Sequence, residues 1–313
     1  MNPPVSVIIP TYNRRQMLRE AVASVLAQRE VGLELIIVDD GSTDGTWDDL
    51  HHGALAQMLD AAPAGCSVVT EPIEHRGPAA ARNRGVALAG ASHIAFLDSD
   101  DLWAPQKLEC QLDYMAAHPE YPLVQTNELW VRSGRRVNPG LRHKKLAGDI
   151  FEPSLRTCLV SPSAVMMRIE LFHEMGGFDE ELAACEDYDL WLRILSRYPA
   201  GLLDEPLVTR RAGHPNQLSA TVPALDRFRI RALLKLLTLP DLTGCRRMSV
   251  AEVLAEKCGI YANGLLRRGR RDEFDFYAAL GHEARAWFAG GAQPSPDYWR
   301  AALHDQPLDA ETP

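Results

Sequence analysis

The chain has 313 residues, which leaves room for one large α/β domain, or for one such domain and a helical appendix. Its 46% of apolar residues suffice for a sizeable core, and its 24% of charged residues are ordinary for a soluble protein. The net charge of −9 argues against nucleic acid as the main partner, because phosphate backbones attract basic surfaces. The six cysteines form no C-x-x-C pair, so we expect reduced thiols. The segment MNPPVSVIIP lacks a basic n-region and a long apolar h-region, so we expect no signal peptide. No apolar run approaches the ~20 residues that span a bilayer, so we expect a cytoplasmic protein that could still touch a membrane surface.

Strands and helices alternate along the first hundred residues. Short apolar runs predict buried strands, and apolar positions at helical spacing predict the helices between them. In chain order we expect strands at 5–10, 33–38, 67–71 and 93–97, and helices at 14–29, 44–59 and 78–90. This alternation predicts βαβ units and a doubly wound, Rossmann-like nucleotide-binding half over residues 1–101.

The second part of the chain is less regular. Its apolar runs predict strands at 123–131, 161–167 and 202–209, short helices at 169–175 and 188–198, and a mobile basic loop at 132–147. After Pro223 the pattern turns helical, and we expect helices at 225–239, 249–268, 272–289 and 297–304. We therefore expect an α/β domain over residues 1–222, whose second half is 102–222, and a helical extension over residues 223–313.

The acidic tetrad Asp98-Ser99-Asp100-Asp101 directly follows the predicted strand at 93–97. Carboxylates this close repel each other unless a cation or several donors lie between them. Mg²⁺ and Mn²⁺ prefer oxygen ligands and often join carboxylates to the phosphates of a substrate. The tetrad therefore indicates a metal–diphosphate site. The alternative is a solvated turn, or Asp100 or Asp101 as the cap of a helix from Trp103 to His118.

Two more polar segments follow predicted strands, at Pro10-Thr11-Tyr12-Asn13 and at Asp39-Asp40. The carboxyl ends of parallel strands meet at one edge of a sheet, where open α/β sheets bind ligands. A tyrosine can stack on a base there, and an aspartate can accept a hydrogen bond from a base N–H group. The alternative for Asp39-Asp40 is a strand-to-helix turn with side-chain capping.

Two further places carry candidate functional residues. Arg76 precedes the predicted helix at 78–90, where an arginine and the helix dipole together suit an anion; a surface arginine in a loop is the alternative. Glu186 and Asp187 lie at the start of another predicted helix. A carboxylate there could be a general base toward an acceptor hydroxyl, although an acidic pair at a helix start often only complements the dipole.

Six segments together resemble the family 2 glycosyltransferases of the GT-A fold, in the family's order over residues 4 to about 220. They are VSVIIPTYNR, LELIIVDDGSTDGT, GPAAARNRGVALAG, IAFLDSDDLW, GGFDE and EDYDLWLRI. The resemblance implies a mixed sheet flanked by helices. It also implies transfer of a sugar from a nucleoside-diphosphate donor to an acceptor hydroxyl, with inversion at the anomeric carbon and with Mg²⁺ or Mn²⁺ as cofactor.

The resemblance also implies roles for individual residues. The donor would be held by Pro10, Thr11, Tyr12, Asn13, Asp39, Asp40, Arg76, Asp98 and Ser99. The metal would be held by Asp98, Asp100, Asp101 and His214. Asp187 would deprotonate the acceptor, with Glu186 as its partner or rival. His214 would close over the diphosphate or reach the metal, and an ordinary loop histidine is the alternative.

The expected donor is a UDP-sugar, and TDP- or GDP-sugars fit the same expectation. The expected acceptor is a glycan or glycolipid, and the chain lacks the Q-x-x-R-W motif of processive synthases. Basic residues at 267–271 could dock on an anionic membrane at the inner face, or be a solvated helix end. The rival functions are a non-catalytic nucleotide-sugar binder and a sugar-phosphate nucleotidylyltransferase; the latter would need a Gly-rich loop after the first strand.

Overall fold

The computed structural model describes residues 4–29, 31–138, 140–213, 222–290 and 292–307. The chain packs as two compact units, and each is formed from several segments. The first unit comprises Met1–Ile150, Leu159–Glu181 and Tyr198–His214. The second comprises Phe151–Cys158, Leu182–Arg197 and Pro215–Pro313. The domain boundary expected at residue 222 stays a prediction, because a packing unit need not coincide with a domain.

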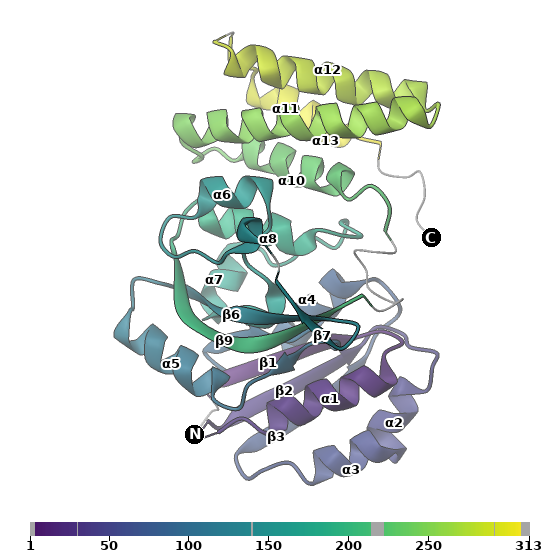
Figure 1. The fold of residues 1–313 in the computed structure, drawn as a ribbon, viewed down its shortest axis with the longest axis vertical. Helices are drawn as coiled ribbons and strands as arrows, with labels where there is room; N and C mark the ends of the chain where they lie inside the picture. Colours follow the sequence, from purple (N-terminus) through teal and green to yellow (C-terminus); the bar gives the residue numbers. More distant parts are fainter. Residues whose placement is uncertain (1–3, 30, 139, 214–221, 291, 308–313) are drawn as a thin grey trace. The chain divides into compact units, whose positions relative to one another are not determined.

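A nine-stranded mixed sheet is the centre of the first unit (Figure 1). Its strands are β1 (Val5–Thr11), β2 (Leu33–Asp39), β3 (Cys66–Pro72), β4 (His93–Phe96), β5 (Leu102–Trp103), β6 (Leu123–Arg132), β7 (Arg135–Val137), β8 (Val165–Arg168) and β9 (Ala200–Ala212). Their order is β3-β2-β1-β4-β8-β6-β9-β5, with β7 paired to β6. The strands β1 to β4 are parallel to their neighbours in that group, while β8 runs antiparallel to both β4 and β6.

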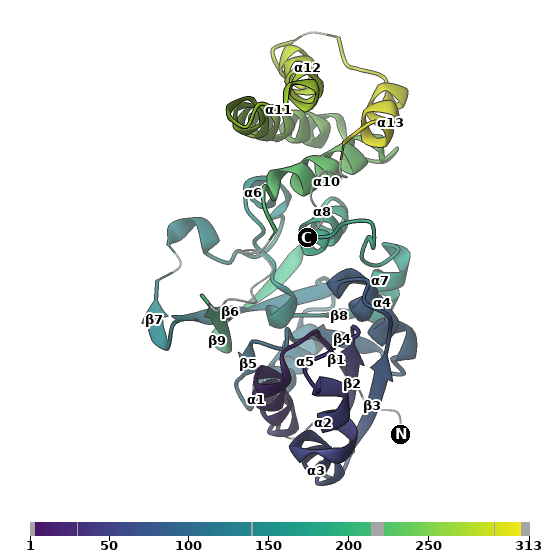
Figure 2. The same cartoon turned by 90° about the vertical axis from the view of Figure 1, so that its right-hand side faces the viewer.

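Helices cover both faces of this sheet, which confirms the predicted α/β class. They are α1 (Arg15–Leu26), α2 (Thr46–His52), α3 (Ala54–Asp60), α4 (Pro78–Leu88), α5 (Lys107–Ala117) and α7 (Ile169–Glu174), with short 3₁₀ turns η1 (Leu141–His143) and η2 (Pro162–Ala164). Figure 2 shows α4 and α7 across the sheet from α1. A β-carbon on Gly85 of α4 would lie 2.4 Å from Ile8 Cγ2, so only glycine lets α4 approach β1 this closely.

The first unit departs from the sequence prediction in four places. The helix expected at 44–59 is two helices, because the Asp49 side chain accepts a hydrogen bond from the Ala54 N–H group at the break. The loop expected at 132–147 contains β7 and η1, and the strand expected from residue 161 begins as η2. The helix expected from Trp103 begins only at Lys107.

The late start of α5 overturns the capping interpretation of Asp100 and Asp101. Trp103 belongs to β5 and pairs with Val208 of β9, and its indole N–H donates to the Ser163 carbonyl at 2.7 Å. These contacts hold residues 102 and 103 extended. The residue before α5 is Gln106, so neither aspartate caps a helix.

The second unit is helical. It contains α6 (Phe151–Arg156), α8 (Glu186–Leu195), α10 (Asp226–Thr238), α11 (Gly244–Arg267), α12 (Arg271–Phe288) and α13 (Pro296–His304), so the four helices expected after residue 222 are confirmed. A buried ion-pair network joins α8 to α10, since Asp189 meets Arg193 at 2.7 Å and Lys235 at 2.9 Å. Among the described residues no helix is long and apolar enough to cross a membrane.

Candidate functional site

Three carboxylates gather where β4 ends. Side-chain oxygens of Asp98, Asp100 and Asp101 lie within 4.8 Å of one another, and we call these residues the acidic triad. The backbone turns sharply here, because the Asp101 N–H group donates to the Asp98 carbonyl at 2.9 Å. Two distant segments fix the Asp101 carboxylate: Ser163 Oγ donates to it at 2.7 Å, and the Arg211 N–H group donates at 2.9 Å. Contacts from distant segments thus hold the triad in place, and it is not a flexible turn.

The electrostatics of the triad favour a cation. Burial raises the pKa of Asp101 well above its ordinary value, and the neighbouring charges of Asp100 and Asp98 raise it further. Two arginines offset part of this repulsion: Arg14 Nη1 lies 2.9 Å from Asp100 Oδ2, and Arg82 Nη2 lies 2.7 Å from Asp98 Oδ1. Converging carboxylate oxygens are the donor set that Mg²⁺ and Mn²⁺ prefer, so the residues present fit the expected metal.

The end of β2 supplies Asp40, whose carboxylate binds the loop before α4. It accepts hydrogen bonds from the N–H groups of Arg76 (2.8 Å) and Gly77 (2.9 Å), and the His75 Nδ1 atom lies 2.8 Å away. Burial raises the pKa of Asp40, and these donors counteract the rise. The adjacent Asp39 accepts from the Ser42 N–H group at 3.1 Å. Together with the acidic triad, Asp39 and Asp40 form what we call the acidic edge.

The end of β1 supplies an exposed aromatic ring beside this edge. Tyr12 is 41% exposed, and its ring stacks on that of His75 with centroids 3.9 Å apart. The neighbouring Asn13 ties the segment to the loop after β2, since its side-chain oxygen accepts from the Thr43 N–H group at 2.7 Å. Pro10 and Thr11 are buried in β1 itself, and the Thr11 carbonyl accepts from the Asp40 N–H group at 2.9 Å.

The two arginines near α4 have different partners. The Arg76 side chain is 65% exposed and pairs with Glu180 at 2.7 Å, while the Arg82 side chain is 6% exposed and pairs with Asp98. Asn83, next to Arg82, exchanges two hydrogen bonds with the backbone of Phe178, at 2.9 and 3.0 Å. The GGFDE segment is therefore anchored on α4, at the side of the triad.

Sequence reasoning gave no role to five residues that shape this edge, namely Arg14, His75, Arg82, Ser163 and Arg211. Arg14, His75 and Arg82 lie within or beside segments already singled out, so a search for cations near the predicted carboxylates could have found them. Ser163 and Arg211 lie 62 and 110 residues from Asp101, and no local pattern marks them. Ser99 is buried in the turn of the triad. His214 lies outside the described residues.

Glu186 and Asp187 occupy the first turn of α8, in the second unit, so they are not brought together with the acidic triad within one unit. The residue before them, Cys185, has a left-handed backbone (φ 62°), a conformation that costs about 1–3 kcal/mol for a residue with a side chain and is concentrated at functional sites. Glu186 is buried, whereas Asp187 is partly exposed. The Asp187 carboxylate accepts from the Tyr188 N–H group at 2.7 Å and lies 3.7 Å from Cys158 Sγ.

Several known proteins are similar in sequence to part of this chain. An uncharacterized glycosyltransferase of Rickettsia conorii is 34% identical over 209 residues, which is 65% of this chain and 32% of the relative. The Escherichia coli enzyme named UDP-Glc:alpha-D-GlcNAc-diphosphoundecaprenol beta-1,3-glucosyltransferase WfgD is 30% identical over 197 residues, 61% of this chain and 69% of WfgD. The match to this chain thus spans about a third of the length of the Rickettsia relative.

Solved structures share the fold at low sequence identity. TarS 1–349 of S. aureus in complex with UDP-GlcNAc has a TM-score of 0.66 and 19% identity, over 97% of this chain and 91% of TarS 1–349. The mannosyltransferase PcManGT of Pyrobaculum calidifontis, solved with GDP-Man and Mn²⁺, has a TM-score of 0.58 and 19% identity, over 99% and 89% of the two chains. These similarities confirm the predicted GT-A fold. The model of glycosyl transferase family 2 matches residues 6–175, and the chain belongs to that family.

Proposed function

We propose that this protein transfers a sugar from a nucleoside-diphosphate donor to an acceptor hydroxyl group, with Mg²⁺ or Mn²⁺ held by the acidic triad. The observation that carries the proposal is the convergence of three largely buried carboxylates within 4.8 Å at the carboxyl end of β4. Membership of family 2 supports the same reaction. The name of WfgD contains UDP-Glc, TarS 1–349 was solved in complex with UDP-GlcNAc, and PcManGT was solved with GDP-Man and Mn²⁺. These similarities support a nucleotide-sugar donor and a divalent metal.

The base and ribose of the donor would lie at the ends of β1 and β2. One face of the Tyr12 ring is stacked on His75, and the exposed part of the ring is available to a base. Asp40 binds three donors of the loop at 75–77, so its main contribution would be to hold that loop against the base. We expect UDP as the nucleotide, with GDP and TDP as the alternatives.

The reaction needs stabilisation of the leaving diphosphate and removal of a proton from the acceptor. The bound metal would act as a Lewis acid that neutralises charge developing on the diphosphate. Arg14 and Arg82 hold Asp100 and Asp98 in place and put two positive charges beside that position. Asp187 would take the acceptor proton while the new C–O bond forms with inversion, and its partial exposure favours it over the buried Glu186.

The acceptor would be a glycan or a lipid-linked glycan intermediate. At the turn between α11 and α12, Leu266 is 51% exposed and Arg267 and Arg268 are also exposed. An apolar side chain flanked by cations suits the surface of an anionic bilayer, so we propose peripheral docking there. The expected location at the inner face of a cytoplasmic membrane stays a prediction.

Release of UDP from UDP-glucose and UDP-GlcNAc tests the proposed donor chemistry. We expect slow release of UDP, with water as the acceptor, that needs Mn²⁺ or Mg²⁺ and stops in the presence of EDTA. The variant Asp101→Asn should abolish this activity, while Asp113→Asn, an exposed aspartate of α5, should not change it. Nucleotide binding without any release from UDP-, GDP- or TDP-sugars would instead favour the non-catalytic binder.

A further inference from the structure

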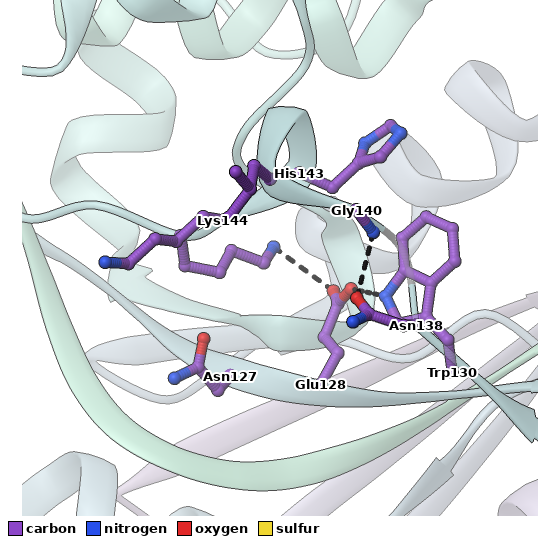
Figure 3. Close-up of a pocket in the computed structure, with 9 residues that line it drawn as sticks. Asn127, Glu128, Trp130, Asn138, Gly140, His143 and Lys144 are labelled. Atoms are coloured by element: carbon purple, nitrogen blue, oxygen red, sulfur yellow. Dashed lines mark hydrogen bonds and ion pairs between the residues drawn. The ribbon is translucent and has the colours of Figure 1, made fainter.

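A hollow with a cavity volume of about 230 Å³ lies over the outer half of β6 in the first unit (Figure 3). Its main lining residues are Asn127, Glu128, Trp130, His143, Lys144 and Lys145, and we call it the basic hollow. We propose that the basic hollow binds the acceptor and that this acceptor is anionic, a sugar that carries phosphate or carboxylate groups. The inference rests on the proposed function, because it names the substrate class that would receive the sugar.

The hollow lies where the pairing of β6 with β9 is irregular. The register shifts on both sides of Asn127, which faces Pro206, while Glu128 faces Val208. Such bulges bend a strand and redirect its side chains, and they are common beside active sites. Glu128 and Trp130, two positions apart, point to the same face of the sheet. The segment from β7 through η1 forms the opposite wall with His143 and Lys144.

The floor of the hollow is a carboxylate whose charge is cancelled. The Glu128 side chain is 4% exposed and lies 3.1 Å from Lys145 Nζ and 3.9 Å from an Arg210 nitrogen, and the Trp130 indole N–H donates to it at 2.9 Å. Burial alone would raise the pKa of Glu128, but the two cations lower it to about 2. The Glu128 carboxylate is therefore ionised, and Lys145 and Arg210 compensate its negative charge, so it does not repel an anion in the hollow.

The walls suit a sugar ring. The Trp130 and His143 rings lie 5.1 Å apart between centroids, and the Arg210 guanidinium lies 4.7 Å from the Trp130 ring centroid. An aromatic wall beside a few polar groups is the composition of a typical small-molecule site. The Asn127 amide is at the edge and donates to Asp204, the carboxylate on that side.

Positive charge around the hollow is in excess, although the chain as a whole carries −9. Exposed cations follow each other on β6, β7 and the segment around η1, namely Arg132, Arg135, Arg136, Arg142 and Lys144. Within the part of the chain that the structure describes, none of these five lies at ion-pair distance from an acidic side chain. A surface of unpaired cations with a neutralised floor attracts anions and is poorly suited to a neutral ligand.

The basic hollow adjoins the acidic triad within the first unit. Ser161 Oγ lies 2.6 Å from Lys145 Nζ at the floor, and two residues later Ser163 Oγ donates to Asp101. On β9 the Arg210 side chain faces the hollow, while the Arg211 N–H group donates to Asp101. Because β9 separates β6 from β5, hollow and triad lie two strands apart, about 10 Å. An acceptor of one or two sugar units in the hollow could therefore extend toward the triad and present a hydroxyl to the donor.

Ligand-observed NMR with three matched probes tests the inference. Glucose, glucuronate and glucose 6-phosphate share one ring and differ in charge, and saturating UDP with Mg²⁺ keeps the phosphate probe out of the donor site. We expect binding of glucose 6-phosphate, glucuronate or both, and none of glucose. The double variant Arg142→Gln/Lys144→Gln should weaken that binding at least tenfold. Arg285→Gln/Arg300→Gln, which makes the same charge change at two exposed positions of the second unit, should leave it unchanged.

The outcomes separate the two proposals. Binding of glucose 6-phosphate alone assigns a phosphate-bearing acceptor, and binding of glucuronate alone assigns a uronate. Equal binding of glucose, anion binding that the double variant does not weaken, or no binding of any probe while UDP and Mg²⁺ still bind would overturn the inference and leave the donor proposal intact. If the wild-type protein bound neither UDP nor Mg²⁺, the result would count against the proposed function itself.

Discussion

The acidic edge and the basic hollow belong to the same unit but differ in how far cations compensate their carboxylate charges. At the edge the three carboxylates of the triad converge, and Arg14 and Arg82 form ion pairs with Asp100 and Asp98. Burial and the charges of Asp100 and Asp98 nevertheless raise the pKa of Asp101. In the hollow one carboxylate, Glu128, meets two cations and its pKa falls to about 2. The first arrangement is suited to a cation and the second to an anion, although the two lie about 10 Å apart by strand spacing.

Removing one carboxylate of the acidic triad should have the largest effect. We expect Asp101→Asn to lower the rate of sugar transfer roughly 10³-fold, because a charged group that stabilises the transition state contributes about that much. Steady-state release of UDP measures this, with Asp113→Asn as the matched control. Retention of more than a tenth of the rate would mean that the edge does not hold the catalytic metal.

Replacing the proposed general base should have the second largest effect on sugar transfer. We expect Asp187→Asn to lower the turnover of sugar transfer about 10²-fold, within the range for loss of a general base, while the dissociation constant for UDP and Mn²⁺ stays unchanged. Glu186→Gln is the companion variant, and it should disturb stability more than turnover because Glu186 is buried. If Glu186→Gln lost turnover at intact stability and Asp187→Asn did not, the two roles would be exchanged.

Removing one cation beside Glu128 in the basic hollow should lower the free energy of unfolding. Lys145→Met leaves the buried Glu128 carboxylate with one cation less, and removing a partner of a buried pair costs about 3 kcal/mol of unfolding free energy. Urea unfolding of wild type and variant at neutral pH measures this difference. A loss below about 0.5 kcal/mol, the size of an ordinary surface substitution, would contradict the description of the floor.

The same ion pair predicts a dependence on pH. Because the pKa of Glu128 is lowered from 4.5 to about 2, its contribution is fully present above pH 4.5 and disappears as the pH falls from 4.5 to about 2. The stability difference between wild type and Glu128→Gln should therefore shrink across that interval. A difference that stays constant down to pH 2 would show that Glu128 is not paired as described.

Loss of the aromatic stack should have the smallest effect. His75→Ala removes the ring beneath Tyr12, and aromatic pairs contribute about 1 kcal/mol beyond their buried area. We expect the KM for the nucleotide sugar to rise about fivefold, with kcat nearly unchanged, since the base takes no part in the chemistry. A larger effect on kcat than on KM would place His75 closer to the reacting atoms.

The acidic edge could be predicted from sequence because its parts are local. Each carboxylate follows a strand that its apolar run identifies, and parallel strands bring their carboxyl ends together. The sequence pattern therefore predicts that Asp39, Asp40 and the acidic triad lie at one edge of the sheet. The positive charges beside the triad are harder to predict. The pattern points to Arg76, yet Arg82 pairs with Asp98, because the pairing depends on how the first turns of α4 face β4.

The basic hollow could not be predicted in the same way. Its lining residues come from β6 and the segment around η1, and the irregular pairing of β6 with β9 at Asn127 has no marker in the sequence. The basic, turn-rich pattern of residues 132–147 predicts a mobile loop, because neither the pairing of β7 with β6 nor the burial of Lys145 beside Glu128 follows from local pattern. Contacts between distant segments created the site.

Thermal unfolding with UDP, GDP and TDP, each with and without Mn²⁺, tests the central claim most directly. A ligand that binds only the folded chain stabilises it by about 2.7 kcal/mol at a hundredfold excess over Kd. We predict a rise in Tm with UDP that requires Mn²⁺ and disappears in Asp101→Asn, while Asp113→Asn behaves as wild type. No rise with any nucleotide, or a rise that neither Mn²⁺ nor Asp101 influences, would contradict a metal–diphosphate site at the acidic edge.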